Sequence, residues 1–237
     1  MKKEHIQFLF KQTINDYNTV ANDYTRTRVF IPEDIKAMAD YAKIGDRVLD
    51  SGCASGRLFG VLQEKNVEYF GIDISEKLID IAKKTYPEAN FQVGDALNLP
   101  FPNNYFDKVF SVSVLHHIPS KELQMQYLKE THRVLKTGGL LVFRVWDFWR
   151  RKSAMKLILK YTFLKLIGKS KLDFNEVFVP WKDSTGSPIT QRYFHCFTKN
   201  EIKNLAIKSG LKTNKLWRAG KDPRTNIYLI AEKASPA

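Results

Sequence analysis

Residues 48–57, with the sequence VLDSGCASGR, constrain the fold of this chain most strongly. Apolar residues typical of a buried strand lead into a turn of small residues, and a helix is predicted to begin near Ser55. Small side chains let backbone N–H groups approach a ligand closely, and the positive end of the following helix would point at the same place. This pattern is typical of a site that binds a nucleoside-containing cofactor.

Two acidic residues follow further apolar runs. Asp73 ends the run YFGID, and Asp95 follows the run FQVG. In a doubly wound sheet, residues just past the carboxyl ends of neighbouring strands line one crevice, so we expect both aspartates to converge with the small-residue turn. The alternative is that each aspartate caps a helix, although Ser75 is the better cap after Asp73 because Leu78 stands at its third position.

Predicted strands alternate with predicted helices along the chain. Such alternation predicts a parallel sheet with right-handed crossovers. Two apolar runs near the C-terminus predict a closing hairpin. The predicted strands cover residues 47–50, 69–73, 90–94, 106–112 and 139–145, and the hairpin covers residues 211–220 and 226–233.

The length of 237 residues suits a single domain, which we divide into four parts. Helical spacing of apolar residues continues to Thr27, and a second helix is predicted to start at Pro32 and to end before Gly45. The first helix is expected to lie over the cofactor as a lid. The four parts are residues 1–45 (lid and cap helices), 46–145 (cofactor-binding half), 146–198 (basic aromatic substrate insertion) and 199–237 (closing helix and strand hairpin).

The composition disfavours several classes of protein. No run of eighteen apolar residues is present, and the first residues lack the apolar core and cleavage site of a secretory signal. The two cysteines, Cys53 and Cys196, form neither a disulfide framework nor a zinc-binding pattern, and Cys53 is expected to be packed rather than reactive. We therefore expect a cytoplasmic location.

The charge is strongly basic, with 38 Lys and Arg against 25 Asp and Glu and a net charge of +13. Polyanions are the expected partners, although a generally lysine-rich surface gives the same total. Residues 146–180 mix aromatic and basic side chains, which suits a nucleic acid. The run KLILKYTFLKLIGK also fits a helix on an anionic membrane, or a helix that packs its apolar stripe on the domain.

Five blocks of sequence, VLDSGCASGR, FGIDIS, VGDALNLPF, FDKVFSVSVLHHI and HRVLKTGGLLVF, resemble in this order the motif series of the Rossmann-like class I S-adenosylmethionine-dependent methyltransferases. The resemblance covers residues 46–143. It implies an α/β fold with a Rossmann-like seven-stranded, mostly parallel sheet, helices on both faces and an antiparallel last strand. It also implies an enzyme whose cofactor is S-adenosyl-L-methionine.

The same resemblance implies roles for individual residues. Gly52 and Gly56 would border the methionine part of the cofactor, Asp73 would accept from the ribose hydroxyls, and Asp95 would accept from the adenine amino group. Ala54 stands where the family usually has glycine, and we expect a slightly tighter pocket because alanine is a mild replacement where φ is negative. The implied cofactor-binding residues are Asp50, Gly52, Ala54, Gly56, Asp73, Ile74, Asp95, Ala96 and Ser113.

The segments YNTVANDYTRTR, FRVWDF, FVPW and QRYFHCFTKNEI carry a second resemblance, which spans nearly the whole chain. They are similar to the tRNA methyltransferase family that esterifies 5-carboxymethyluridine at the wobble position. This implies tRNA as a partner, recognised through its anticodon stem-loop, and a small zinc-binding activator protein, for which the edge strand near residues 91–93 is the expected surface. Association with a membrane is not expected. The matching residues are Tyr17, Ala21, Thr27, Arg28, Val145, Trp146, Val179, Pro180, Trp181, Arg192, Tyr193, His195 and Phe197.

The implied reaction is an in-line displacement in which a carboxylate oxygen attacks a sulfonium methyl group. The carboxylate is already ionised, so positioning and desolvation matter more than a strong base. Arg28 and Arg192 are the candidates to hold it, because a guanidinium binds a carboxylate in a fork. If QRYFHCF is extended, Arg192 lies on the opposite face from Tyr193 and His195, so the three are not expected to share the crevice.

Two histidines complete the candidate catalytic residues, which are Arg28, Arg192, His195 and His116. His116 follows the fourth predicted strand at the crevice, while His195 is equally well explained as a structural histidine. No third ligand is spaced for a metal site. We expect Trp146 to line the crevice and Trp181 to pack. The alternatives to a tRNA enzyme are a small-molecule or lipid-precursor methyltransferase at a membrane surface, and a non-catalytic RNA-binding or donor-binding module.

Overall fold

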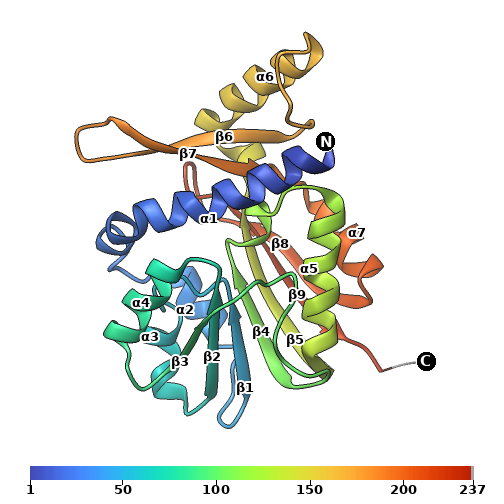
Figure 1. The fold of residues 1–237 in the computed structure, drawn as a ribbon. Coiled ribbons are helices and arrows are strands. Elements are labelled where there is room, and N and C mark those ends of the chain that lie inside the picture. The colour runs from blue at the N-terminus through green and yellow to red at the C-terminus, as the bar shows by residue number, and fades with distance from the viewer. Residues whose placement is uncertain (236–237) are drawn as a thin grey trace.

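The structure, a computed structural model, describes residues 1–235. Figure 1 shows a twisted sheet between layers of helices, with a long N-terminal helix and a second small sheet above it. The main sheet has seven strands in the order β3-β2-β1-β4-β5-β9-β8. Its strands are β1 Arg47–Ser51, β2 Glu68–Asp73, β3 Asn90–Val93, β4 Phe106–Val112, β5 Leu135–Trp146, β8 Leu211–Ala219 and β9 Asn226–Lys233.

The direction of the strands confirms the predicted fold class. The strands from β3 to β5 pair in parallel, and β9, the last strand in the sequence, is antiparallel to both of its neighbours. The chain order reverses between β1 and β4, which lie side by side. Ligands of such sheets bind at this reversal, outside the carboxyl ends of the strands.

Alternating side chains give the sheet two apolar faces. Val48, Phe110 and Val142 point to the face that α2, α3 and α4 cover, while Leu49 and Val109 point to the face that α5 and α7 cover. Burial on both sides explains why these strands are almost continuously apolar. The helices of the two layers are α2 Glu33–Ala39, α3 Phe59–Leu62, α4 Glu76–Thr85, α5 Lys121–Val134 and α7 Lys199–Lys208.

The predicted start of α4 is confirmed, since the Ser75 hydroxyl accepts a hydrogen bond from the Leu78 N–H at 3.3 Å. The predicted start of the earlier helix at Ser55 is wrong. Residues 52–58 form turns, and α3 begins only at Phe59 and is four residues long. Gly56 has a φ of +81°, a left-handed conformation that cannot continue a right-handed helix. The turn therefore has no helix end pointing at it.

The N-terminal helix α1, Lys3–Arg26, crosses above the carboxyl ends of the strands (Figure 1). It packs against α4 and against β7 of the small sheet. The second predicted helix, α2, stops at Ala39 and does not extend to Gly45 as expected. Among residues 1–235, no helix combines the length and the apolar character needed to cross a membrane.

The insertion folds into the helix α6 Lys152–Leu166 and a separate antiparallel hairpin, β6 Glu176–Lys182 and β7 Pro188–His195. The sequence pattern predicts a helix here but no second sheet. The hairpin packs on α1 and on the turn after β4, so it closes one side of the space above the main sheet.

Candidate functional site

A cleft lies between α1 and the carboxyl ends of the parallel strands. The lining residues come from the turn after β1, the ends of β2 and β3, the turn after β4, the end of β5, β7, and α1 with the segment that follows it. Of the expected site residues, the cleft brings together Gly52, Ala54, Asp73, Ile74, Asp95, Ala96, Ser113, Arg28, His116 and Arg192.

The glycine turn is tightly packed. Gly52 has a φ of +83°, and a Cβ built on it would lie 2.2 Å from Cγ2 of Val114. A Cβ on Gly56 would lie 2.7 Å from the Phe91 ring. Both positions therefore require glycine for space as well as for backbone conformation. Gly52 lines the cleft, whereas Gly56 is not among the lining residues and supports the turn from behind.

Ala54 differs from expectation. Its φ is +49°, so this alanine adopts the left-handed conformation and not the negative φ that was expected. For an L-residue this conformation is strained by about 1–2 kcal/mol. The Ala54 N–H donates a 2.9 Å hydrogen bond to Oδ2 of Asp73, which helps to hold the turn in this conformation.

Asp73 connects the turn to the end of β2. Its Oδ1 accepts a 2.9 Å hydrogen bond from the Ser75 N–H, and its Oδ2 accepts from Ala54. Ser75, not Asp73, caps α4, so helix capping does not account for this carboxylate. Burial raises the pKa of Asp73, opposed by the backbone hydrogen bonds. Each carboxylate oxygen can accept a second hydrogen bond, so the side chain remains able to accept from a ligand diol.

Asp95 lies two residues beyond β3. Its Oδ1 accepts a 2.8 Å hydrogen bond from the Leu97 N–H, which fixes the turn and directs the backbone of Ala96 along the cleft wall. Burial raises the pKa of Asp95. Within residues 1–235, Oδ2 of Asp95 has no hydrogen-bond donor, which leaves it free to accept from an amino group.

Asp50 does not reach the cleft. It is buried beneath the turn, where the Tyr69 hydroxyl donates a 2.9 Å hydrogen bond to its Oδ2. Burial raises the pKa of Asp50 to about 7. Ser113, by contrast, lines the cleft with a φ of +66°, and its hydroxyl accepts a 3.0 Å hydrogen bond from Arg144.

These groups fit S-adenosyl-L-methionine. Two carboxylates that can still accept hydrogen bonds lie on neighbouring strand ends, and the space beside them is lined by apolar Ile74, Leu97 and Ile118. The carboxylates match a ribose diol and an adenine amino group, and the apolar side chains match the purine faces. Asp73, Asp95 and the turn at Gly52 would hold the cofactor.

The two histidines after β4 carry their ring protons on opposite nitrogens. Nδ1 of His117 lies 3.0 Å from the Tyr193 carbonyl oxygen, so it donates, and Nε2 accepts from the Tyr17 hydroxyl at 2.7 Å. Nδ1 of His116 accepts from the Trp146 N–H at 3.3 Å, so the proton is on Nε2. That Nε2 is buried without a partner in the described chain, and His116 lines the cleft. Burial keeps both rings neutral by lowering both pKa values, that of His117 to about 3.

Two arginines meet on one indole. The guanidinium carbons of Arg28 and Arg192 each lie 4.6 Å from the Trp181 ring centroid, and Arg28 also lies 4.1 Å from the Tyr24 ring. Trp181 is largely buried, while both arginines line the cleft. Aromatic packing of this kind fixes the plane of a guanidinium and leaves its N–H edge available for an anion.

His195 lies outside the cleft. Its Nε2 is 2.8 Å from Oε1 of Glu201, and the Tyr193 hydroxyl donates to Glu176 at 2.8 Å. The two glutamates raise the pKa of His195 against the effect of its burial. The extended strand β7 places Arg192 toward the cleft and directs Tyr193 and His195 away from it, in agreement with the period of two.

Two arginines of the cleft were not predicted from the sequence. Arg144 forms a 2.5 Å ion pair with Asp34, and its Nε is buried without a partner in the described chain. Arg57 has no acidic partner within residues 1–235, and burial lowers its pKa. In the sequence, the position of Arg57 directly after Gly56 of the glycine turn was the feature that could have identified it as a cleft residue. Cys53 is buried and burial raises its pKa, as expected for a packed thiol.

Comparisons with known proteins agree with this geometry. A family model described as a methyltransferase domain matches residues 49–143. The chain is 27% identical over 235 residues to the tRNA (carboxymethyluridine(34)-5-O)-methyltransferase of Schizosaccharomyces pombe, covering 92% of this chain and 94% of that protein. It is 32% identical to a protein of Encephalitozoon cuniculi named as a candidate methyltransferase, covering 70% of each chain. The chain spans only 31% of the Arabidopsis thaliana protein that is also named tRNA (carboxymethyluridine(34)-5-O)-methyltransferase.

Solved structures share the fold. An S-adenosylmethionine-dependent methyltransferase of Methanosarcina mazei superposes with a TM-score of 0.73 at 23% identity, covering 84% of this chain and 98% of that one. A Haloferax volcanii methyltransferase, solved in complex with the Trm112 methyltransferase activator, superposes with a TM-score of 0.66 at 15% identity, covering 95% and 99%. With the cleft and its two aspartates, these similarities show that the chain belongs to the family of S-adenosylmethionine-dependent methyltransferases.

Proposed function

We propose that this protein methylates the carboxylate of 5-carboxymethyluridine at the wobble position of tRNA and forms a methyl ester. The observation that carries the proposal is the pair of arginines, Arg28 and Arg192, held on Trp181 at the side of the cofactor cleft. The near full-length similarity to a yeast enzyme named for this reaction supports the same substrate.

The bound cofactor would supply an electrophilic sulfonium methyl group. The protein's own groups then have to align a carboxylate oxygen with that methyl without blocking it. Arg28 and Arg192 can bind the carboxylate on the side that faces away from the methyl group. Lone pairs of a carboxylate oxygen on the other side then remain free to attack. Burial lowers the pKa values of both histidines, which makes them weak bases, and an ionised carboxylate needs no base.

Aromatic side chains beside the arginines suit an unstacked base. Trp146 lines the cleft and stacks on the fully buried Phe194, with ring centroids 5.1 Å apart, and the His116 ring lies 5.0 Å from the Phe194 ring. The unpartnered Nε2–H of His116 is a donor that a uracil carbonyl or the substrate carboxylate would satisfy. We therefore assign Arg28, Arg192 and His116 to the substrate, and a structural role to His195.

The test is transfer of labelled methyl from the cofactor to tRNA. The purified protein should label tRNA from cells that lack the activity, and mild base should release the label as methanol. Nucleoside mass spectrometry should find the methyl ester of 5-carboxymethyluridine. Label that resists base, or label confined to small molecules or lipid, contradicts the proposal.

An activator subunit is part of this proposal. The edge of the main sheet at β3 has one unpaired side, and Val93 at its end is exposed. Such an edge can pair with a strand of a second protein. The structural neighbour solved with the Trm112 activator supports the existence of a partner. The resemblance to the tRNA methyltransferase family implies that this partner is a small zinc-binding protein. A tRNA substrate also agrees with the cytoplasmic location expected from the sequence.

A further inference from the structure

Helix α6 has apolar side chains on two faces, and only one of them is covered. On the inner face, Ala154 and Ile158 are buried against Val177 and Phe194. The outer face carries three large apolar side chains in the open, with Leu159 65%, Phe163 60% and Leu166 69% exposed. The spacing of i, i+4 and i+7 places these three side by side on one stripe of the helix.

The same segment is strongly basic. Residues 150–171 hold eight Lys and Arg side chains and no Asp or Glu. Lys152, Lys156 and Lys160 are exposed on α6. Lys156 and Lys160 each lie three residues before an apolar side chain of the outer face, and Lys152 lies seven residues before Leu159. Within residues 1–235, Lys165 is the one member of this basic set with an acidic partner, Asp173 at 3.2 Å.

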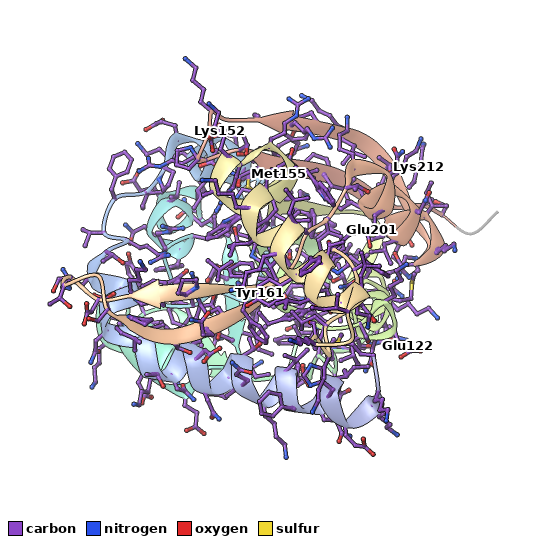
Figure 2. The ribbon with its side chains drawn as sticks, turned by 90° about the horizontal axis from the view of Figure 1, so that it is seen from above. Glu122, Lys152, Met155, Tyr161, Glu201 and Lys212 are labelled. Atoms are coloured by element: carbon purple, nitrogen blue, oxygen red, sulfur yellow. The ribbon has the colours of Figure 1, made fainter. Side chains whose placement is uncertain are left out.

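The helix stands at the outside of the molecule. Figure 1 shows α6 above the small sheet and far from the main sheet, and Figure 2, seen from above, shows it lying across the top with Lys152, Met155 and Tyr161 along its length. A groove between α1 and the end of α6 is lined by the exposed Phe8 together with Lys165 and Lys171, and Glu4 and Asp173 also line it. The surface is therefore broad, and it faces away from the cofactor cleft.

Three kinds of partner could cover such a surface. A nucleic acid would satisfy the lysines, but leucine side chains have no planar face on which a base can stack, so Leu159 and Leu166 would gain little. A second copy of the chain would bring two basic surfaces together, and their repulsion opposes association. An anionic lipid bilayer matches both features, because apolar side chains enter the headgroup boundary while lysines reach the lipid phosphates.

We propose that the outer face of α6 binds the surface of an anionic membrane. The face lies in the plane of the interface, with Leu159, Phe163 and Leu166 inserted and Lys152, Lys156 and Lys160 against the headgroups. The proposal does not depend on the tRNA substrate, because the surface contains no residue of the cleft.

The test is co-sedimentation of the full-length protein with vesicles of phosphatidylcholine, with and without phosphatidylserine. The protein should bind only the vesicles that contain phosphatidylserine, and salt should weaken the binding. The triple variant L159S/F163S/L166S should bind at least about tenfold more weakly. The affinity of the variant K156Q/K160Q for the phosphatidylserine vesicles should fall about fivefold for each lysine replaced. A matched control is I207S, which removes an exposed apolar side chain from α7.

Measurements of methyl transfer, tRNA binding and oligomeric state distinguish the three kinds of partner. The triple variant should keep its folded circular dichroism spectrum and its methyl transfer. The proposal is overturned if the wild type does not bind phosphatidylserine vesicles, or if the triple variant binds them as well as I207S does. It is also overturned if the triple variant loses tRNA binding while vesicle binding is unchanged, or if light scattering shows that the wild type is a dimer and the triple variant a monomer.

Discussion

The Tyr17 hydroxyl donates a 2.7 Å hydrogen bond to Nε2 of His117, across 100 residues of sequence. Nδ1–H of the same ring donates to the carbonyl of Tyr193 at 3.0 Å. One half-buried imidazole thus joins α1, the turn after β4 and the strand β7. These three segments form the roof, the floor and one wall of the cleft, so the ring fixes the position of the lid helix over the cofactor site.

Replacing Tyr17 with Phe should therefore destabilise the protein. The change removes the protein donor to Nε2 of His117, a half-buried ring that lines the cleft, at a cost of about 1 kcal/mol. Urea unfolding measures the change in the free energy of unfolding. Affinity for the cofactor should also fall, because α1 is held less firmly over the cleft. Tyr105→Phe is the control, since the Tyr105 hydroxyl makes no hydrogen bond within residues 1–235. Equal stabilities of the two variants would contradict the role of this contact.

Replacing Asp73 with Ala should weaken cofactor binding by about 10- to 100-fold, because charged hydrogen bonds to the ribose are lost. Titration calorimetry on the ligand-free protein measures the dissociation constant. The change also removes the acceptor for the N–H groups of Ala54 and Ser75, so some loss of stability should accompany it. The exposed Asp80→Ala on α4 should change neither quantity. Unchanged affinity in Asp73→Ala would remove the basis for the cofactor site.

Replacing Arg192 with Met should lower kcat/KM for tRNA by about 10- to 100-fold through loss of a charge-assisted contact to the carboxylate. Arg192→Lys keeps the charge but not the fork, so it should restore only part of the activity. Cofactor affinity should be unaffected in both variants. Arg224→Met, on an exposed loop, is the matched control. If Arg192→Met affected the cofactor and not the tRNA substrate, the assignment of this residue would be wrong.

Replacing Ala54 with Gly should leave the stability unchanged or raise it by up to about 1 kcal/mol. Glycine relieves the left-handed strain at φ +49°, and the entropy of the unfolded chain offsets part of the gain. The opposite result is expected for Ala37→Gly on the exposed side of α2, which should cost about 1 kcal/mol. Urea unfolding of both variants checks the sign, and a loss in Ala54→Gly similar to that in Ala37→Gly would show that this turn is unstrained.

Stability should fall as the pH is lowered from about 6.5 toward 3. The unfolded chain binds a proton at His117 near pH 6.5, while in the folded protein burial and Arg192 lower the pKa of His117 to about 3. The unfolded state therefore binds more protons across this range, and the loss from this residue is on the order of 2 kcal/mol at pH 5. Unfolding free energies at several pH values should show a shallower dependence in His117→Gln than in the wild type. Identical slopes would mean that the ring is protonated in the folded protein.

Much of the fold was predictable because its signals are local. The apolar runs from Val48 to Val142 are long enough to mark strands, and turn residues mark their ends. Asp73 and Asp95 were predictable as cleft residues for the same reason, since parallel strands bring their carboxyl ends to one edge. Ser75 could be identified as a helix cap from its spacing to Leu78 alone.

Predictions from local sequence patterns were wrong where the position of a side chain depends on segments far away in the sequence. Asp50 lies near the end of β1, but it pairs with Gly71, two residues before Asp73, and Tyr69 on the neighbouring strand holds it beneath the turn. His195 was a candidate for the cleft, and the contact with Glu201 from α7 takes it elsewhere. Ala54 took a positive φ because the fold brings Asp73 to its N–H.

Local patterns were enough to predict the order of strands and helices, the glycine turn and the two aspartates of the cleft, because periodicity and turn chemistry act over a few residues. Long-range packing sets which face of α6 is covered, which arginines share the cleft and which nitrogen of each histidine carries the proton. Those features depend on contacts between residues far apart in the chain, and no short pattern in the sequence encodes such contacts.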